Sequence, residues 1–306
     1  MQKAPWDAGG WLEAATANAT AALLLAGRPP TGEWTNVRTW ARSCVRTVPT
    51  AAGILWIKHS YRLPPGEEVV VAELSRRWPA VLPTIVATWP GGFAMEAIPG
   101  EELTAGHALK DWVVVARTIA EIAAGETVHA EEWLERGVRD RRPAEWPGQI
   151  AGLLGSPVLD TLDVEVRNAF EEFVDDFTTR YLDAFELPPT LVHQDSGCCN
   201  IQVRSGRVVI FDWADVIVGH PMFSCDRLLD QAPQSFHAAV IDAFCAPLTL
   251  SIEEFRAMRR SNVLHEILRY HDELAYIAPA DPAAESLANS VRSQIQVLVE
   301  HERKRR

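Results

Sequence analysis

Apolar positions along the chain change their spacing about one third of the way from its start. After a helix expected over residues 11–26, β-like runs cover residues 34–40, 44–49 and 54–58. A helix expected over 66–78 separates these runs from two more, at 82–88 and 93–97. From residue 104 onward the apolar spacing is helical, and three or four helices are expected after residue 237. The pattern therefore predicts a strand-rich part followed by a longer helical part.

Two long helices are expected in the middle of the chain. Residues 109–124 are strongly apolar, and Gly125 is expected to cap their C-terminal end. Residues 164–185 carry four aromatic residues at spacings of three and four, predicted to be core: Phe170, Phe173, Phe177 and Tyr181. Residues 136–148, with two prolines, are predicted to be a loop that can carry a substrate-specific insertion.

Polar residues of a particular kind gather in residues 191–215, which read LVHQDSGCCNIQVRSGRVVIFDWAD. Two β-prone runs, 201–203 and 208–211, flank a turn sequence and predict a hairpin. A hairpin places Asn200, before its first strand, beside Asp212, after its second. His193 and Asp195 precede Asn200 in the spacing H-x-D-x-x-x-x-N.

These residue types fit phosphoryl transfer from a nucleotide. An amide and a carboxylate, Asn200 and Asp212, can hold Mg²⁺, while Asp195 can accept the proton of an attacking hydroxyl. The alternative is that they are ordinary turn residues, because Asp, Asn and Gly are common between strands. The fixed offsets favour the catalytic interpretation.

Lys58 ends the third β-like run and can place an ammonium group against phosphates. In the helix expected over 66–78, Glu67 lies on the apolar stripe, so it is the candidate partner of Lys58. Glu68 is the second candidate. The plainer alternatives are a lysine that extends from an edge strand into water and a solvated glutamate in a first helical turn.

The segments HQDSGCCN and VVIFDWAD resemble the catalytic and metal-binding segments of the aminoglycoside phosphotransferase family, relatives of the protein kinases that phosphorylate small molecules. Asp212-Trp213 stands where a protein kinase has D-F-G. The resemblance covers about residues 43–230. It implies an α+β, bilobal protein-kinase-like fold: a small antiparallel β-sheet N-lobe over 1–97, which binds the nucleotide, and a larger, mainly helical C-lobe over 98–306.

The resemblance also implies roles for individual residues. Asp195 would be the catalytic base, Asn200 and Asp212 the Mg²⁺ ligands, and Lys58 the phosphate-binding lysine, while His193 would brace the catalytic loop. This chain departs from the family pattern at Gln194, where a glycine is usual, and at the adjacent cysteines 198 and 199.

Two further positions follow from the resemblance. Residues 95–100 resemble the interlobe hinge, where the backbone of Glu96 and Ile98 would meet the adenine edge; an ordinary strand end with a Pro-Gly turn is the alternative. Asp226 corresponds to an aspartate that would brace the catalytic loop, and a helix N-cap role is compatible with this.

One sequence feature of protein kinases, the glycine-rich loop, is missing. Residues 40–43 contain no glycine where a protein kinase carries its glycine-rich loop, and no P-loop sequence occurs.

The helix expected over 262–275 carries three candidates for substrate recognition, Glu266, Tyr270 and Asp272. A solvated helix face is the simpler interpretation of these residues.

Composition limits the partners. A net charge of -12 and a pI near 5.2 argue against nucleic acid or an anionic membrane and suit a cationic substrate. Five cysteines without a paired pattern predict reduced thiols in the cytoplasm. No signal peptide or membrane span is expected, and the oligomeric state stays open.

Together these observations predict an enzyme that uses ATP or GTP with Mg²⁺ to phosphorylate a hydroxyl of a small molecule. The candidate acceptors are aminoglycosides or other antibiotics, sugars, amino alcohols and hydroxy amino acids. A nucleotide-binding pseudokinase and a kinase-fold domain acting on a protein are the alternatives. The lysine, asparagine and aspartates are all present, and no long activation segment is recognisable, so both are disfavoured.

Overall fold

The structure, a computed structural model, describes residues 5–60, 66–180, 187–259, 261–277 and 279–304. Its N-terminal part contains a five-stranded sheet in the order β1-β2-β3-β5-β4, in which every neighbouring pair is antiparallel. The strands are β1 (Thr35–Thr39), β2 (Ser43–Thr50), β3 (Gly53–Ser60), β4 (Ile85–Trp89) and β5 (Gly92–Glu96).

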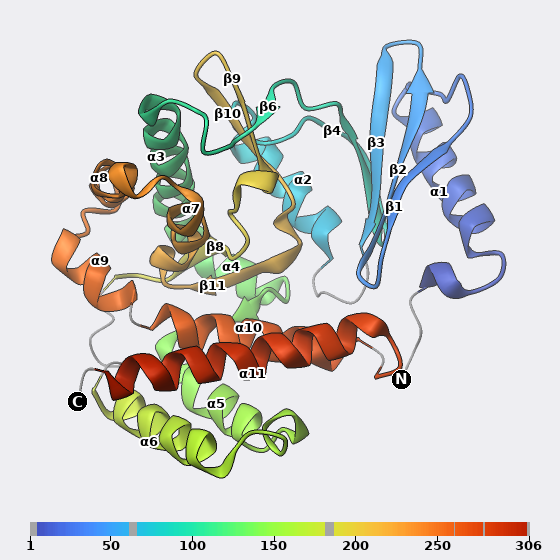
Figure 1. The fold of residues 1–306 in the computed structure, drawn as a ribbon. Helices are drawn as coiled ribbons and strands as arrows, with labels where there is room; N and C mark the ends of the chain where they lie inside the picture. The colour runs from blue at the N-terminus through green and yellow to red at the C-terminus, as the bar shows by residue number, and fades with distance from the viewer. Residues whose placement is uncertain (1–4, 61–65, 181–186, 260, 278, 305–306) are drawn as a thin grey trace.

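Two helices pack on this sheet. The inner face of α1 (Trp11–Leu25) buries Ala19 and Leu23 in a small core with residues of β2 and β3. By contrast, α2 (Glu67–Arg77) buries its apolar stripe, including Val70 and Leu74, in the main core that continues into the C-terminal part. Figure 1 shows α1 on the outer side of the sheet and α2 on the side of the other helices. The lobe boundary at residues 97 and 98 stays a prediction.

The C-terminal part is mainly helical, with two small sheets ordered β10-β9-β6 and β7-β11-β8. The strands are β6 (Glu101–Glu102), β7 (Arg139–Asp140), β8 (Thr190–His193), β9 (Ile201–Arg204), β10 (Arg207–Ile210) and β11 (Val216–Gly219). The helices are α3 (Leu109–Glu126), α4 (Ala130–Glu135), α5 (Trp146–Leu154), α6 (Val164–Arg180), α7 (Asp226–Gln231), α8 (His237–Leu248), α9 (Ile252–Arg259), α10 (Asn262–Tyr276) and α11 (Pro282–Arg303). The predicted α+β bilobal architecture is confirmed.

Within the described residues, no single helix has the length and apolar character needed to cross a membrane. Taken together, the helical segment 234–248 and α9 are long and apolar enough. The two segments are bent by 106° relative to each other.

Three local predictions were wrong. Residues 136–148 are not a plain loop, since they contain β7 and the first turn of α5, where Pro147 is compatible with helix. The face of α10 is not solvated, because His265, Glu266 and Arg269 are buried. Gly125 lies inside α3 rather than at its end. The expected continuation of α6 to residue 185, with Tyr181, falls outside the described residues.

Gly125 is required by a close approach. A Cβ at this position would overlap the indole of Trp78, whose Nε1 donates a hydrogen bond of 2.7 Å to Glu126 and is thereby fixed. We expect Gly125→Ala to lower the free energy of unfolding by about 1–3 kcal/mol, as overpacking does. Gly152→Ala in α5 is the matched control, since its added Cβ meets no atom within 4 Å. Urea unfolding measures both, and equal stabilities would contradict the packing argument.

Two buried histidines predict a stability loss in acid. Burial lowers the pKa of His59 and of His220 to about 4, helped at His59 by Arg46 and only partly opposed at His220 by Glu254. The unfolded chain has ordinary histidines with a pKa near 6.5, so it binds protons first as the pH falls. The folded protein should therefore lose roughly 2 kcal/mol per histidine between pH 7 and pH 5.

Urea unfolding at pH 7 and pH 5 measures this loss. In His220→Asn, the amide oxygen can still accept the hydrogen bond that Met222 N–H donates to His220 Nδ1. This variant should therefore show a pH dependence smaller by roughly 2 kcal/mol. His301→Gln, at an exposed position of α11, should leave the dependence unchanged. The explanation fails if the wild-type protein is equally stable at both pH values.

Candidate active site

The predicted hairpin is present and brings two candidate metal ligands together. Strands β9 and β10 pair from Ile201↔Ile210 to Arg204↔Arg207, and Ser205 and Gly206 turn with positive φ. Beyond the paired strands, Phe211 N donates to Asn200 O at 3.0 Å. Asn200 and Asp212 therefore leave the same end of the hairpin side by side.

Lys58 joins the N-terminal sheet to this hairpin. Its Nζ donates to Glu67 Oε1 at 2.9 Å and to Asp212 Oδ1 at 2.6 Å. Burial alone would lower the pKa of Lys58, but the two carboxylates outweigh it and raise the pKa above its usual value. The lysine is therefore a permanent cation. Glu68, the other candidate partner, instead accepts from Gly91 N at 2.9 Å.

The Asp195 carboxylate lies between one hydrogen-bond donor, Asn200, and one ion-pair partner, Arg227. Its Oδ2 accepts from Asn200 Nδ2 at 3.1 Å, and Arg227 Nη2 lies 3.3 Å from its Oδ1. The same Asn200 amide donates to the backbone oxygen of Asp195 at 2.8 Å. The Asp195 side chain is 29% exposed, while its Oδ1 is buried.

His193 connects the loop to the hairpin. Its Nε2 lies 3.0 Å from Phe211 O, which can only accept, so this nitrogen carries the proton. Its Nδ1 then accepts from Asp195 N at 3.2 Å. Trp213 packs edge-on against the ring, with centroids 4.6 Å apart. The neutral imidazole thus holds Asp195 beside the residue that precedes Asp212.

The predicted brace at Asp226 is wrong, because Ser224 makes the contacts instead. Ser224 Oγ accepts from His193 N at 3.1 Å, and Ser224 O accepts from Ser196 Oγ. Asp226 begins α7 without capping it and faces α9 and α10, where it binds Arg259 at 2.6 Å and Asn262. Burial raises the pKa of Asp226 to about 6 despite Arg259.

The residues around Asp212 fit a magnesium ion that also binds phosphates. Asp212 has φ 63° and ψ 61°, a left-handed conformation that is uncommon outside glycine and is found at functional sites. The Asn200 amide nitrogen donates to Asp195, so its Oδ1 is the atom that could bind a metal. The described residues hold no cluster of three His, Cys, Asp or Glu side chains suited to a metal. Two protein oxygens completed by phosphates and water are the usual Mg²⁺ arrangement.

The predicted hinge residues lie at the end of β5. Glu96 N already donates to Thr84 O at 3.0 Å, and the Glu96 carboxylate accepts from Arg28 at 3.1 Å. Glu96 and Ile98 both line a cavity of about 420 Å³, whose other walls come from residues 79–84 and the β9–β10 hairpin. Contact of their backbone with adenine stays a prediction.

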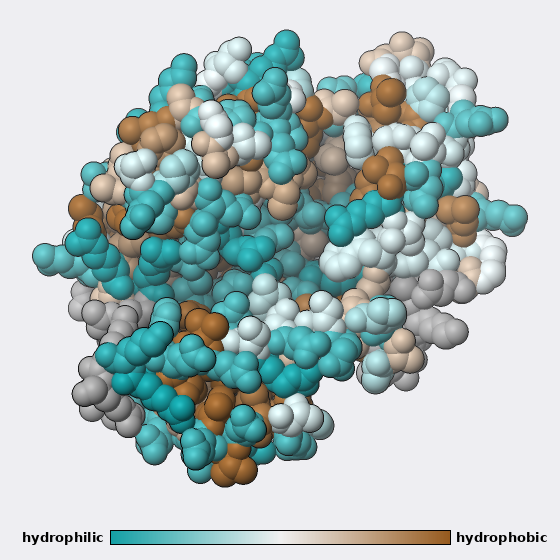
Figure 2. Space-filling view, viewed as in Figure 1, coloured by the Kyte–Doolittle hydropathy of each residue, from teal (hydrophilic) through white to brown (hydrophobic). Residues whose placement is uncertain are grey.

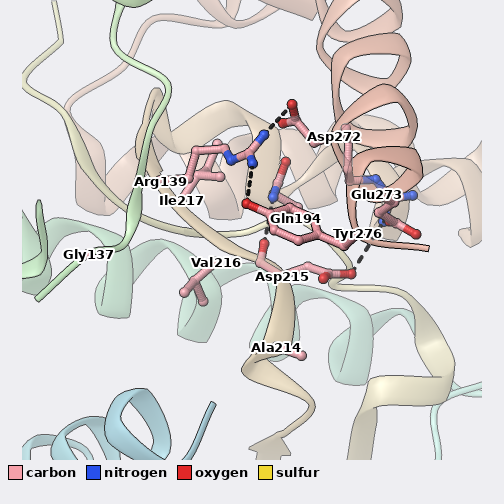
Figure 3. A pocket seen from close by; sticks show the side chains of 11 residues that line it. Gly137, Arg139, Gln194, Ala214, Asp215, Val216, Ile217, Asp272, Glu273 and Tyr276 are labelled. Atoms are coloured by element: carbon pink, nitrogen blue, oxygen red, sulfur yellow. Dashed lines mark hydrogen bonds and ion pairs between the residues drawn. The ribbon is translucent and has the colours of Figure 1, made fainter. Parts of the chain in front are cut away.

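The three acceptor candidates on α10 differ in position. Glu266 is buried and pairs with Arg269 at 3.0 Å, and the Tyr270 ring lies 4.7 Å below the Arg269 guanidinium. Asp272 pairs with Arg139 and Arg141. Of the three, Asp272 alone lines the cavity of about 150 Å³ shown in Figure 3. Their roles toward a substrate stay predictions.

An arginine occupies the turn that lacks the kinase glycines. Arg42, between β1 and β2, pairs with Asp215 and, at 3.0 Å, with Glu273. Burial would lower the pKa of Arg42, but these carboxylates raise it above its usual value. The turn is thereby fixed to the C-terminal part. The partners of Arg42 lie more than 170 residues away along the chain, so the sequence carries no local signal for these ion pairs.

Figure 2 shows hydrophilic side chains gathered in the hollow between the sheet and the helices. In this structure a lysine of the sheet pairs with a glutamate of a helix, and the helical part carries the H-x-D-x-x-x-x-N loop. These features define the kinase-like class of phosphotransferases. The chain belongs to the phosphotransferase enzyme family, whose sequence model matches residues 72–259. The resemblance deduced from the sequence is confirmed, and the protein is a phosphotransferase.

Solved structures share the fold at low identity. The macrolide 2'-phosphotransferase MphH from Brachybacterium faecium is 17% identical, with a TM-score of 0.62 over 90% of this chain and 97% of that chain. APH(2")-IIia, solved with GDP and kanamycin, is 14% identical, with a TM-score of 0.65 over 95% and 98%. A choline/ethanolamine kinase family protein from Mesorhizobium loti is 17% identical, with a TM-score of 0.61 over 94% and 95%. A search of curated protein sequences gave no match.

Proposed function

We propose that this phosphotransferase moves the γ-phosphoryl group of ATP or GTP, with Mg²⁺, to a hydroxyl of a small molecule. The observation that carries the proposal is the double contact of Lys58 Nζ, at 2.9 Å to Glu67 and 2.6 Å to Asp212. It aligns a cation for the phosphates with a carboxylate for the metal across the two parts of the chain. This is the arrangement that positions a triphosphate in kinases.

Each residue then has one task. Asp195 orients the acceptor hydroxyl and takes its proton, held in place by His193 and Asn200. Asn200 and Asp212 would hold Mg²⁺, which neutralises charge on the transferring phosphoryl group. Lys58 neutralises the phosphates that remain on the nucleotide.

The acceptor is drawn from small molecules. Proteins of similar fold include a macrolide phosphotransferase, aminoglycoside phosphotransferases and a choline/ethanolamine kinase family protein. Resistance to an antibiotic and the phosphorylation of a metabolite are therefore both compatible with the fold. All five cysteines are free thiols, which suits the cytoplasm, where nucleotides are available.

A screen of hydroxyl compounds tests the proposal. Purified protein is incubated with ATP or GTP and MgCl₂ and with aminoglycosides, macrolides, sugars, amino alcohols and hydroxy amino acids in turn, and phosphorylated products are detected by mass spectrometry. We expect transfer to at least one compound, lost when EDTA removes the metal and when Asp195 is replaced. Transfer at more than half of the wild-type rate in the Asp195→Asn protein would contradict the assigned base.

A further inference from the structure

A small cavity lies directly beside the catalytic loop. It has a volume of about 150 Å³. Its lining includes Gln194, Asp215, Arg139 and residues of the C-terminal half of α10, the last of which is Tyr276. Gln194 immediately precedes Asp195, and consecutive Cα atoms lie 3.8 Å apart. The cavity therefore adjoins the segment of the chain that carries Asp195, although the Asp195 side chain is not part of its lining.

The charges around the cavity neutralise one another. Arg42 pairs with Asp215 and Glu273, and Arg139 and Arg141 both pair with Asp272. Arg269 pairs with Glu266 at 3.0 Å and lies 3.9 Å from both Asp215 and Glu273. Four carboxylates thus face four arginines. An acidic wall able to hold a polycation is not formed, because each carboxylate already has a guanidinium partner.

Two of the residues that line the cavity carry a buried polar atom with no hydrogen-bond partner within the described part of the chain: Gln194 Oε1 and Arg269 Nε. Gln194 is 5% exposed and Arg269 6%. The orientation of the Gln194 amide is fixed, because its Nε2 donates to Asp215 O at 2.6 Å and a carbonyl can only accept. Oε1 is therefore an acceptor without a donor. A buried acceptor without a hydrogen bond costs free energy. Binding of a ligand that donates the missing hydrogen bond is therefore favoured.

The volume limits the size of that ligand. A cavity of about 150 Å³ accommodates a single six-membered ring such as benzene. One acceptor, Gln194 Oε1, and one donor, Arg269 Nε, match hydroxyl groups, since each hydroxyl can both donate and accept. A charged amine could donate to Gln194 but would find no free carboxylate, because the four nearby carboxylates are already paired with arginines.

We propose that this cavity is the acceptor subsite and that it selects a neutral, hydroxyl-rich ring of monosaccharide size over a polycation, with Gln194 as the specificity-determining residue. The inference rests on the proposed phosphotransferase function. It assigns to Gln194, which replaces the glycine usual in this family, a hydrogen bond to a substrate hydroxyl.

Competition between defined acceptors tests the selectivity. The wild-type protein with MgCl₂ and the active nucleotide is assayed against neutral monosaccharides and cyclitols, with kanamycin as the polycation, and kcat/KM is measured for each. We expect at least one neutral ring to exceed kanamycin at least tenfold. Preference for kanamycin overturns the inference and leaves the proposed function intact. If no neutral ring is phosphorylated the inference is also overturned, and if the wider screen gives no product either, both fail.

Gln194→Met tests the residue itself, because methionine keeps the side-chain volume and removes the hydrogen-bonding groups. We expect KM for the preferred neutral acceptor to rise about tenfold, while KM for the nucleotide and the melting temperature stay near the wild-type values. Gln296→Met, at an exposed position of α11, is the matched control and should change none of these. An unchanged acceptor KM in a folded Gln194→Met protein overturns the assignment.

Discussion

Asp195→Asn should lower kcat by a factor of about 10²–10⁴, the usual contribution of a positioned general base. Asparagine keeps the size of the side chain and can still accept from Asn200 Nδ2, so the loop geometry is retained. What is lost is the negative charge that takes the hydroxyl proton. KM for the nucleotide should change little, because Asp195 has no role in nucleotide binding. Initial rates over a range of nucleotide and acceptor concentrations separate these parameters.

Asp230→Asn is the matched control. Asp230 lies in α7 close to the catalytic loop, but its carboxylate is 59% exposed and its ion pair is with Arg259 at 2.9 Å. The same chemical change there should leave kcat within about twofold, since exposed ion pairs contribute little. If Asp195→Asn kept more than half of the wild-type kcat, another group would have to be the base.

Lys58→Met should have the second large effect, on stability as well as on activity. It leaves Glu67 buried without its cation, and removing one partner of a buried ion pair typically costs 3–5 kcal/mol. It also removes the cation beside Asp212, so phosphoryl transfer should fall by at least about 10²-fold. Urea unfolding and steady-state rates measure the two effects on the same protein preparation.

The double variant Lys58→Met/Glu67→Gln separates structure from chemistry. Glutamine carries no charge and can still accept from Ser60 Oγ, so most of the lost stability should return. The activity should not return, because no cation faces the phosphates. A double variant that regains both stability and activity would show that Lys58 has a structural role only.

Local spacing was enough to predict several parts of the site. The hairpin follows from two β-prone runs around a turn, and the juxtaposition of Asn200 and Asp212 follows from the hairpin. The contact of Lys58 with Glu67 could be predicted because the apolar stripe of the helix includes Glu67 and not Glu68. Each of these inferences needs only the period of one element or the geometry of one turn.

Contacts between distant segments had no such signal. Arg42 and Asp215 are 173 residues apart, and their pairing depends on how the sheet sits on the helical part. The brace of the catalytic loop was assigned to Asp226 by analogy, whereas Ser224, two residues earlier, faces the loop. The burial of α10 is not visible in the sequence because its carboxylates pair with arginines of distant segments, Asp272 with Arg139 and Glu273 with Arg42. Tertiary pairing of this kind leaves no period in the sequence.

The position of Arg42 would link the two binding events of the proposed transfer reaction. Arg42 lies in the turn between two strands of the sheet that carries Lys58, whereas its carboxylate partners, Asp215 and Glu273, line the cavity beside Gln194. Any shift of the sheet that accompanies nucleotide entry changes the charge balance of that cavity. The affinities of the two substrates are then thermodynamically coupled, and the coupling is reciprocal: whatever factor the nucleotide imposes on the acceptor, the acceptor imposes on the nucleotide.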